Sequence, residues 1–144
     1  VLLFLRILIR FHSGDLVSTA DLQVVAEQTF GQKMDWFFDQ YIRDVGIPRV
    51  TYHFDSPRQA EDGKGWIITG KLHQDIMVKG DPVPGKSFKN LLVPITVNTD
   101  KGPEKVKEFM DGPDKELRIR VENRPKGSPA INENNYCYLT TKEM

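Results

Sequence analysis

The chain has 144 residues, of which 39% are hydrophobic and 28% are charged, so it has the size and composition of one globular domain, or of a small domain with part of another. Its 11 glycines and 9 prolines fall short of a disordered or collagen-like composition. Because 20 lysines and arginines balance 20 aspartates and glutamates, no net charge attracts nucleic acid, and we expect no nucleic-acid partner.

The chain opens with an apolar run, residues 1–11, interrupted only by Arg6 and Arg10. A secretory signal peptide would carry its positive charge before the apolar stretch, and a membrane span needs about 20 apolar residues, so neither is predicted. The run predicts a helix that is apolar on most of its circumference and is buried among neighbouring elements. Since no cap residue precedes it, we expect the natural helix to begin upstream and the chain to be a fragment of a longer protein.

Two further helices are predicted in the first third of the chain. Ser18 and Asp21 have the spacing of a capping box, which predicts a helix start, and Gly31 is placed to end that helix in a left-handed conformation. In the next segment, apolar residues recur at steps of three and four and predict an amphipathic helix that ends at Gly46. Its apolar stripe consists of Met34, Phe37, Phe38, Tyr41, Ile42 and Val45.

After Pro48 the period of the apolar residues changes from about 3.6 to about 2, which indicates strands. Glycine- and proline-containing turns separate the strands, and the longest connection runs from Lys79 to Lys89. The predicted strands cover residues 49–54, 66–73, 91–97, 104–110 and 117–121, with a last strand between 131 and 139. Several short strands without intervening helices are typical of an antiparallel β-sandwich.

The predicted fold class is therefore α+β by segment. A helical piece of two or three helices occupies residues 1–46. An antiparallel, immunoglobulin-like β-sandwich occupies residues 47–144.

Residues that could carry chemistry are few and scattered. His12, His53 and His73 lack the H-E-x-x-H spacing by which a zinc hydrolase places two imidazoles on one helix face. His53 and His73 could meet across paired strands, but ordinary positions on the surface of a sheet are the simpler interpretation. The lone Cys137 lies between two tyrosines and is predicted to be a structural thiol. We predict no catalytic, cofactor-binding or metal-binding residue in this chain.

Four segments of the helical part resemble the end of the catalytic domain in the zinc aminopeptidase family that includes membrane alanyl aminopeptidase. These segments are Val1–Arg6, Ser18–Leu22, Gly31–Tyr41 and Gly46–Val50. In that family a β-sandwich domain begins just after the Gly-x-Pro turn, where the period of this sequence changes. The stretch from Arg124 to Asn132 looks like the last strands of that sandwich. One departure is Tyr41, where many family members carry tryptophan, a ring of similar character.

The resemblance implies a non-catalytic C-terminal part of a zinc aminopeptidase-like protein. The zinc motif, the third zinc ligand, the amine-binding motif and the catalytic tyrosine of the family would all precede Val1. The resemblance therefore assigns no functional residue to this chain, and zinc belongs to the parent protein only. We expect the chain to be inactive alone, with the missing catalytic domain as its partner and the sandwich as a support for that domain.

The interface that the resemblance implies consists of Leu2, Leu5, Leu8, Phe37, Phe38 and Tyr41. In isolation these side chains would expose a patch larger than the few hundred Å² that monomers tolerate, so self-association is expected. The alternative is an immunoglobulin-like module or scaffold without peptidase activity, which binds a protein or a glycan through the loop from Lys79 to Lys89. An H-E-x-x-H motif upstream of Val1 would favour the peptidase, and its absence would favour the scaffold.

Overall fold

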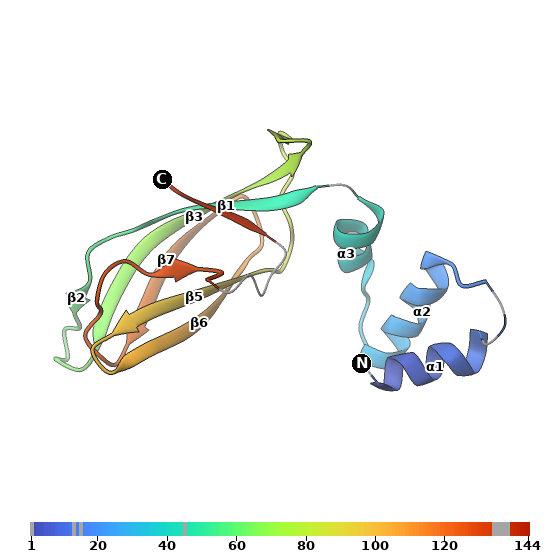
Figure 1. Cartoon of the computed structure of the whole chain (residues 1–144), viewed down its shortest axis with the longest axis horizontal. Helices are drawn as coiled ribbons and strands as arrows, with labels where there is room; N and C mark the ends of the chain where they lie inside the picture. The colour runs from blue at the N-terminus through green and yellow to red at the C-terminus, as the bar shows by residue number, and fades with distance from the viewer. Residues whose placement is uncertain (1, 13, 15, 45, 134–138) are drawn as a thin grey trace. The chain divides into compact units, whose positions relative to one another are not determined.

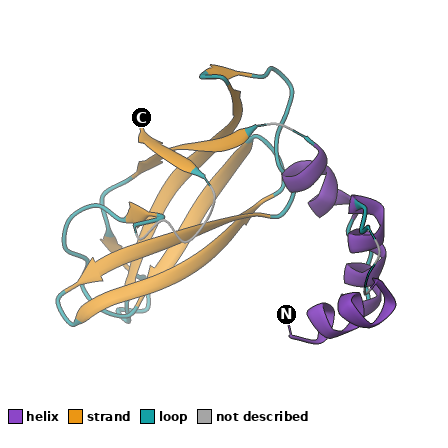
Figure 2. Ribbon diagram, turned by 45° about the vertical axis from the view of Figure 1, so that its right-hand side comes forward, coloured by secondary structure: helices purple, strands orange, loops and turns teal. Residues whose placement is uncertain are grey.

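The computed structural model of the protein describes residues 2–12, 14, 16–44, 46–133 and 139–144 (Figure 1). The chain divides into two compact units, Val1–Val45 and Gly46–Met144. Figure 2 shows helices in the first unit and strands in the second. The described residues contain three short α-helices and a strand-rich part with antiparallel sheets. This content confirms the α+β class.

The helical unit begins with α1 (Leu2–His12), which packs on α2 (Thr19–Phe30). The predicted capping box of α2 is confirmed. The Asp21 N–H donates to Ser18 Oγ at 3.2 Å, and the Ser18 N–H donates to the Asp21 carboxylate at 2.8 Å. Gly31 ends the helix in the predicted left-handed conformation, with φ of 67°. Both caps satisfy backbone groups that lack a partner within the helix.

The third helical segment differs from the prediction of one regular helix. The α-helix α3 covers only Asp35–Phe38, and the chain continues as a π-helical segment, η1 (Asp39–Arg43). The Asp44 N–H donates to the carbonyl of Asp39, five residues back, at 3.0 Å. Because a π turn is wider than an α turn, it shifts later side chains around the helix axis. Ile42, predicted on the apolar stripe, lies within this π-helical segment and is 51% exposed.

The larger sheet of the second unit has six strands and is built around β3 (Trp66–Val78). β3 pairs antiparallel with β1 (Ile47–Phe54) on one side and with β7 (Asp114–Val121) on the other. On the far side of β1, β9 (Thr140–Glu143) adds a parallel strand. Two short strands pair with the ends of β3: β2 (Arg58–Gln59) and β4 (Asp81–Pro82).

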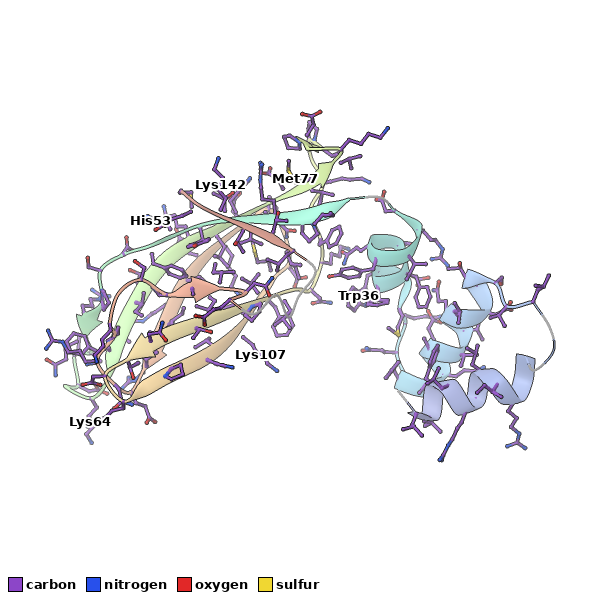
Figure 3. All side chains as sticks on the ribbon, in the orientation of Figure 1. Trp36, His53, Lys64, Met77, Lys107 and Lys142 are labelled. Carbon is purple, nitrogen blue, oxygen red and sulfur yellow. The ribbon has the colours of Figure 1, made fainter. Side chains whose placement is uncertain are left out.

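The smaller sheet has three strands in the order β6–β5–β8. β5 (Leu91–Thr99) and β6 (Gly102–Met110) form an antiparallel hairpin, and β8 (Ala130–Ile131) pairs with the other edge of β5. β6 is therefore an edge strand. Its exposed side chains include Lys105 and Lys107, of which Lys107 is labelled in Figure 3.

Each sheet buries one face, and the buried side chains form the core of the second unit. Ile68, Leu72 and Ile76 on β3 are at most 1% exposed, whereas Lys71, between two of them, is exposed. The predicted alternation along this strand is thus confirmed. β5 and β7 contribute two further rows of the core: Leu91, Val93, Ile95, Val97, Leu117, Ile119 and Val121.

Candidate functional site

The six side chains predicted as an interface all lie in the helical unit, with different exposures. Leu2 and Leu5 on α1 are 69% and 46% exposed. Phe38 is buried, with its ring 5.7 Å from the ring of Phe37 and 5.8 Å from the guanidinium carbon of Arg43. The other three are half-buried: Leu8, Phe37 and Tyr41. Of the predicted set, the surface of the unit therefore presents mainly the α1 residues.

One side of α1 forms a continuous exposed surface, here called the α1 face. It consists of Leu2, Leu3, Leu5 and Ile9 together with Arg6 and Arg10. Leu3 and Ile9, which the predicted interface omits, are 59% and 64% exposed. The sequence pattern could have predicted both residues, because α1 is apolar on most of its circumference and a helix packed on one neighbour leaves its opposite side exposed.

A polar network holds the helical segments of this unit together. The side-chain amide of Gln23 on α2 donates to Glu27 at 3.0 Å and to Asp35 at 2.7 Å. Its carbonyl oxygen accepts a hydrogen bond from Arg43 at 2.5 Å. Gln23, which is only 9% exposed, thereby joins α2 to α3 and η1. Such a network specifies one arrangement of the helices because each polar group depends on the others.

Glu27 anchors the connection between α2 and α3. Its carboxylate accepts the Met34 N–H at 2.9 Å and pairs with Lys33 Nζ at 3.1 Å. The hydrogen bond from the Met34 backbone, together with those from Gln23 and Lys33, lowers the pKa of Glu27 from 4.5 to about 2. Hydrogen bonds to the charged form of an acid stabilise that form.

The stability of the helical unit is expected to fall in acid through Glu27. A depressed carboxyl pKa contributes stability that is fully present above pH 4.5 and is lost as the pH falls through about 2. Helix content followed by circular dichroism should decrease over this interval. Glu27→Gln should be less stable than the wild-type chain at neutral pH and should lose part of this acid dependence. An identical acid profile in Glu27→Gln would contradict the assignment.

The histidines of the second unit lie on the outer face of the larger sheet, but they are not cross-strand partners. The register pairs His53 with Lys71 and His73 with Thr51. Among the residues that the structure describes, no three His, Cys, Asp or Glu side chains are placed to hold a metal ion. The His12 side chain and Cys137 lie outside the described residues.

His73 instead contacts two carboxylates. Its Nδ1 lies 2.7 Å from Asp114 Oδ1, and its Nε2 lies 3.3 Å from Asp75 Oδ1. The other oxygen of Asp75 accepts a hydrogen bond from Arg49 at 3.0 Å. Arg49–Asp75 and His73–Asp114 are both directly opposite pairs in the register of the sheet. Opposite charges on directly opposite residues stabilise strand pairing modestly.

An open cavity of about 520 Å³ lies beside this cluster. His73, Asp75 and Asp114 line it from the sheet, Pro113 lines it from the turn before β7, and residues 82–87 line it from the other side. Gln74 ties the two linings together: its side-chain amide donates to the carbonyl of Gly112 at 2.7 Å and to that of Phe88 at 3.0 Å.

Comparison of the sequence with protein-family models and with curated proteins finds no match. No described helix has the length and hydropathy needed to cross a membrane. The geometry described above offers two candidate functional features: the α1 face and the cavity beside His73.

Proposed function

We propose that the chain is a non-catalytic support in a zinc aminopeptidase-like protein. The α1 face docks on the catalytic part of that protein. The strand-rich unit, as an immunoglobulin-like β-sandwich, supports the same catalytic part. The single observation that carries the proposal is the exposure of Leu2, Leu3 and Ile9, each at least 59% exposed on one short helix. Contiguous exposed apolar side chains on a folded unit mark an interaction surface.

The free energy of docking comes from removing these side chains from water. Fully burying one leucine or isoleucine side chain contributes about 1.5–3 kcal/mol. The two arginines of the α1 face, Arg6 and Arg10, lie four residues apart on the helix, which carries no acidic residue in its first turn. A complementary surface on the catalytic part would therefore be apolar and bordered by carboxylates.

The strand-rich unit supports the second half of the proposal. Its two sheets each bury one face, so that a core forms mainly from strand residues. The parallel pairing of β9 with β1 joins the last described strand of the unit to its first strand. In the parent protein, hydrolysis of the N-terminal peptide bond would use water activated by zinc bound outside this chain.

A second candidate function is a module that binds a protein or a glycan. The observation that favours it is the cavity of about 520 Å³ beside His73, lined by part of the Lys79–Lys89 loop. Concave sites with apolar walls and a few polar groups are the usual form of ligand sites.

The coding sequence upstream of Val1 tests the choice between the two functions. An H-E-x-x-H motif, followed by a more distant glutamate within a few hundred residues, is expected for the aminopeptidase-like protein. Its absence would overturn that proposal in favour of the scaffold. The non-catalytic role of the chain is tested on the purified chain by metal analysis and by hydrolysis of an aminoacyl reporter. Stoichiometric zinc or turnover of the reporter would contradict that role.

The isolated chain is expected to self-associate through the α1 face. The double substitution Leu5→Glu with Ile9→Glu places two charges on this face and should weaken self-association about tenfold or more, since a charge must be desolvated on burial. Analytical ultracentrifugation measures the effect. Gln28→Glu adds a charge at an exposed position of α2 and is the matched control. Equal association of both variants and the wild-type chain would contradict the proposed docking face.

A further inference from the structure

The His73 cluster has more carboxylate contacts than a neutral imidazole can satisfy. A neutral ring has one N–H donor, and its other nitrogen carries a lone pair. Both ring nitrogens of His73 face carboxylate oxygens, at 2.7 Å for Asp114 and 3.3 Å for Asp75. In the neutral form, one lone pair would therefore point at a negative charge. Only the protonated ring donates to both carboxylates at once.

We propose that His73, Asp75 and Asp114 form a proton-dependent clasp, which ties the turn before β7 to β3 while the His73 ring is protonated and loosens it when the proton leaves. Asp114 is the first residue of β7, directly after the turn, and Asp75 lies on β3. The clasp thus bridges two strands through one side chain. This proposal is independent of the proposed function.

The two carboxylates point to a proton rather than to a metal ion as the bound cation. Asp114 lies at Nδ1 and Asp75 at Nε2. A single metal ion binds one nitrogen of an imidazole ring. A cation bound to Nδ1 would have the carboxylate of Asp114 beside it and would have that of Asp75 on the far side of the ring. The cluster therefore does not chelate one cation with all three groups.

Charged groups face His73 from each neighbouring strand. β1 contributes Arg49, which forms an ion pair with Asp75. β7 contributes Asp114 and, two positions further on, Glu116. β3 itself contributes Lys71 and Asp75, and β9 contributes Lys142, opposite Thr51, the β1 partner of His73. From the loop, Lys86 lines the same cavity. The groups nearest to the ring are the two carboxylates.

The pKa of His73 follows this arrangement. The hydrogen bond to Asp114 is the largest cause and raises the pKa above 6.5, with a further increase from Asp75 and a partial decrease from desolvation. A raised histidine pKa contributes stability that is fully present below pH 6.5 and is lost as the pH rises through the raised value. The clasp is therefore closed in mild acid and open in alkaline solution.

The turn that the clasp holds is also one wall of the cavity. Pro113 and Asp114 line the cavity together with His73, and the Gln74 N–H donates to the carbonyl of Pro113 at 2.7 Å. When the clasp opens, the turn keeps its bonds to Gln74 and loses one of its ties to β3. The turn is then held less firmly in place. Hydrogen exchange of the Gln74 backbone N–H, which bonds to the turn, measures this change.

Two NMR measurements on the full chain test the clasp. One is titration of the His73 ring, and the other is the hydrogen-exchange protection of the Gln74 backbone N–H as a function of pH. Protection factors already correct for the intrinsic pH dependence of exchange. We expect the His73 pKa to exceed 6.5 and the Gln74 protection to fall about two- to fivefold as the ring loses its proton, the size expected for one exposed ion pair.

Four variants identify the cause: Asp114→Asn, His73→Lys, His73→Gln and a control. Asp114→Asn should lower the pKa of His73, and His73→Lys, which stays charged, should keep Gln74 protected over the same pH range. His53→Gln, on the same face of the sheet but two positions away in register, is the control and should change neither measurement. A His73 pKa that is unchanged in Asp114→Asn, or the same pH-dependent loss of protection in His73→Gln, would overturn the proposal.

Discussion

Gly70→Ala is expected to destabilise the strand-rich unit by about 3 kcal/mol, because the added methyl group has no room. A Cβ at this position would lie 2.5 Å from the carbonyl oxygen of His53 and 2.9 Å from Cδ1 of Phe54. His53 and Phe54 belong to β1, which pairs with β3 along this stretch. One of the two close contacts is with backbone, so β1 must move away from β3 and weaken the ladder between them.

Thermal unfolding measures this effect, and the midpoint should fall by about 10–20 °C for a unit of this size. Gly112→Ala is the matched control. No atom lies within 4 Å of a Cβ built at Gly112, so the variant should stay within about 0.5 kcal/mol of the wild-type chain. If Gly70→Ala is as stable as Gly112→Ala, β1 and β3 do not approach each other as closely as described.

Gln74→Met is expected to destabilise the same unit by a comparable amount, about 3 kcal/mol, because it removes three hydrogen bonds of a buried side chain, worth about 1 kcal/mol each. Gln74 is 1% exposed. Its side-chain amide donates to the carbonyls of Phe88 and Gly112, and its carbonyl oxygen accepts the Phe88 N–H at 2.9 Å. Methionine has a similar length and keeps the packing, so the loss is confined to these polar contacts.

Urea unfolding and amide exchange test the role of Gln74. In Gln74→Met the Phe88 amide should exchange faster, since it loses the glutamine as its acceptor. Gln59→Met is the control, because Gln59 is exposed and its side chain makes a long hydrogen bond, 3.4 Å, to the carbonyl of Gly63. Equal stability of the two variants would show that the buried amide does not hold the loop and the turn together.

The parts of the fold that local chemistry determines could be predicted from the sequence. Ser18 and Asp21 form a cap through residues three apart, so their spacing is sufficient. The change of period after Pro48 likewise places the start of the strands, and β1 begins at Ile47. β3, however, continues to Val78, five residues beyond the predicted end, because its last residues pair with the start of β1. Such pairing depends on residues far apart in the chain.

The candidate sites depended on tertiary structure and could be predicted only in part. The π-helical turn at Asp39–Arg43 has a backbone hydrogen bond that no side-chain period signals, and Ile42 within it is exposed. The contact of His73 with Asp114 joins residues 41 positions apart. The sequence could suggest that histidines lie on a sheet face, but only the register of β3 against β7 identifies their partners.

The two lysines of β6 have a consequence for the growth of fibrils. An open edge strand is a template on which a second copy can add a strand. If two copies met antiparallel along β6 with Val106 at the centre, Lys105 of each copy would stand directly opposite Lys107 of the other. Like charges in that position repel. The alternation that leaves Lys105 and Lys107 exposed on this edge therefore opposes the stacking of copies into a continuous sheet.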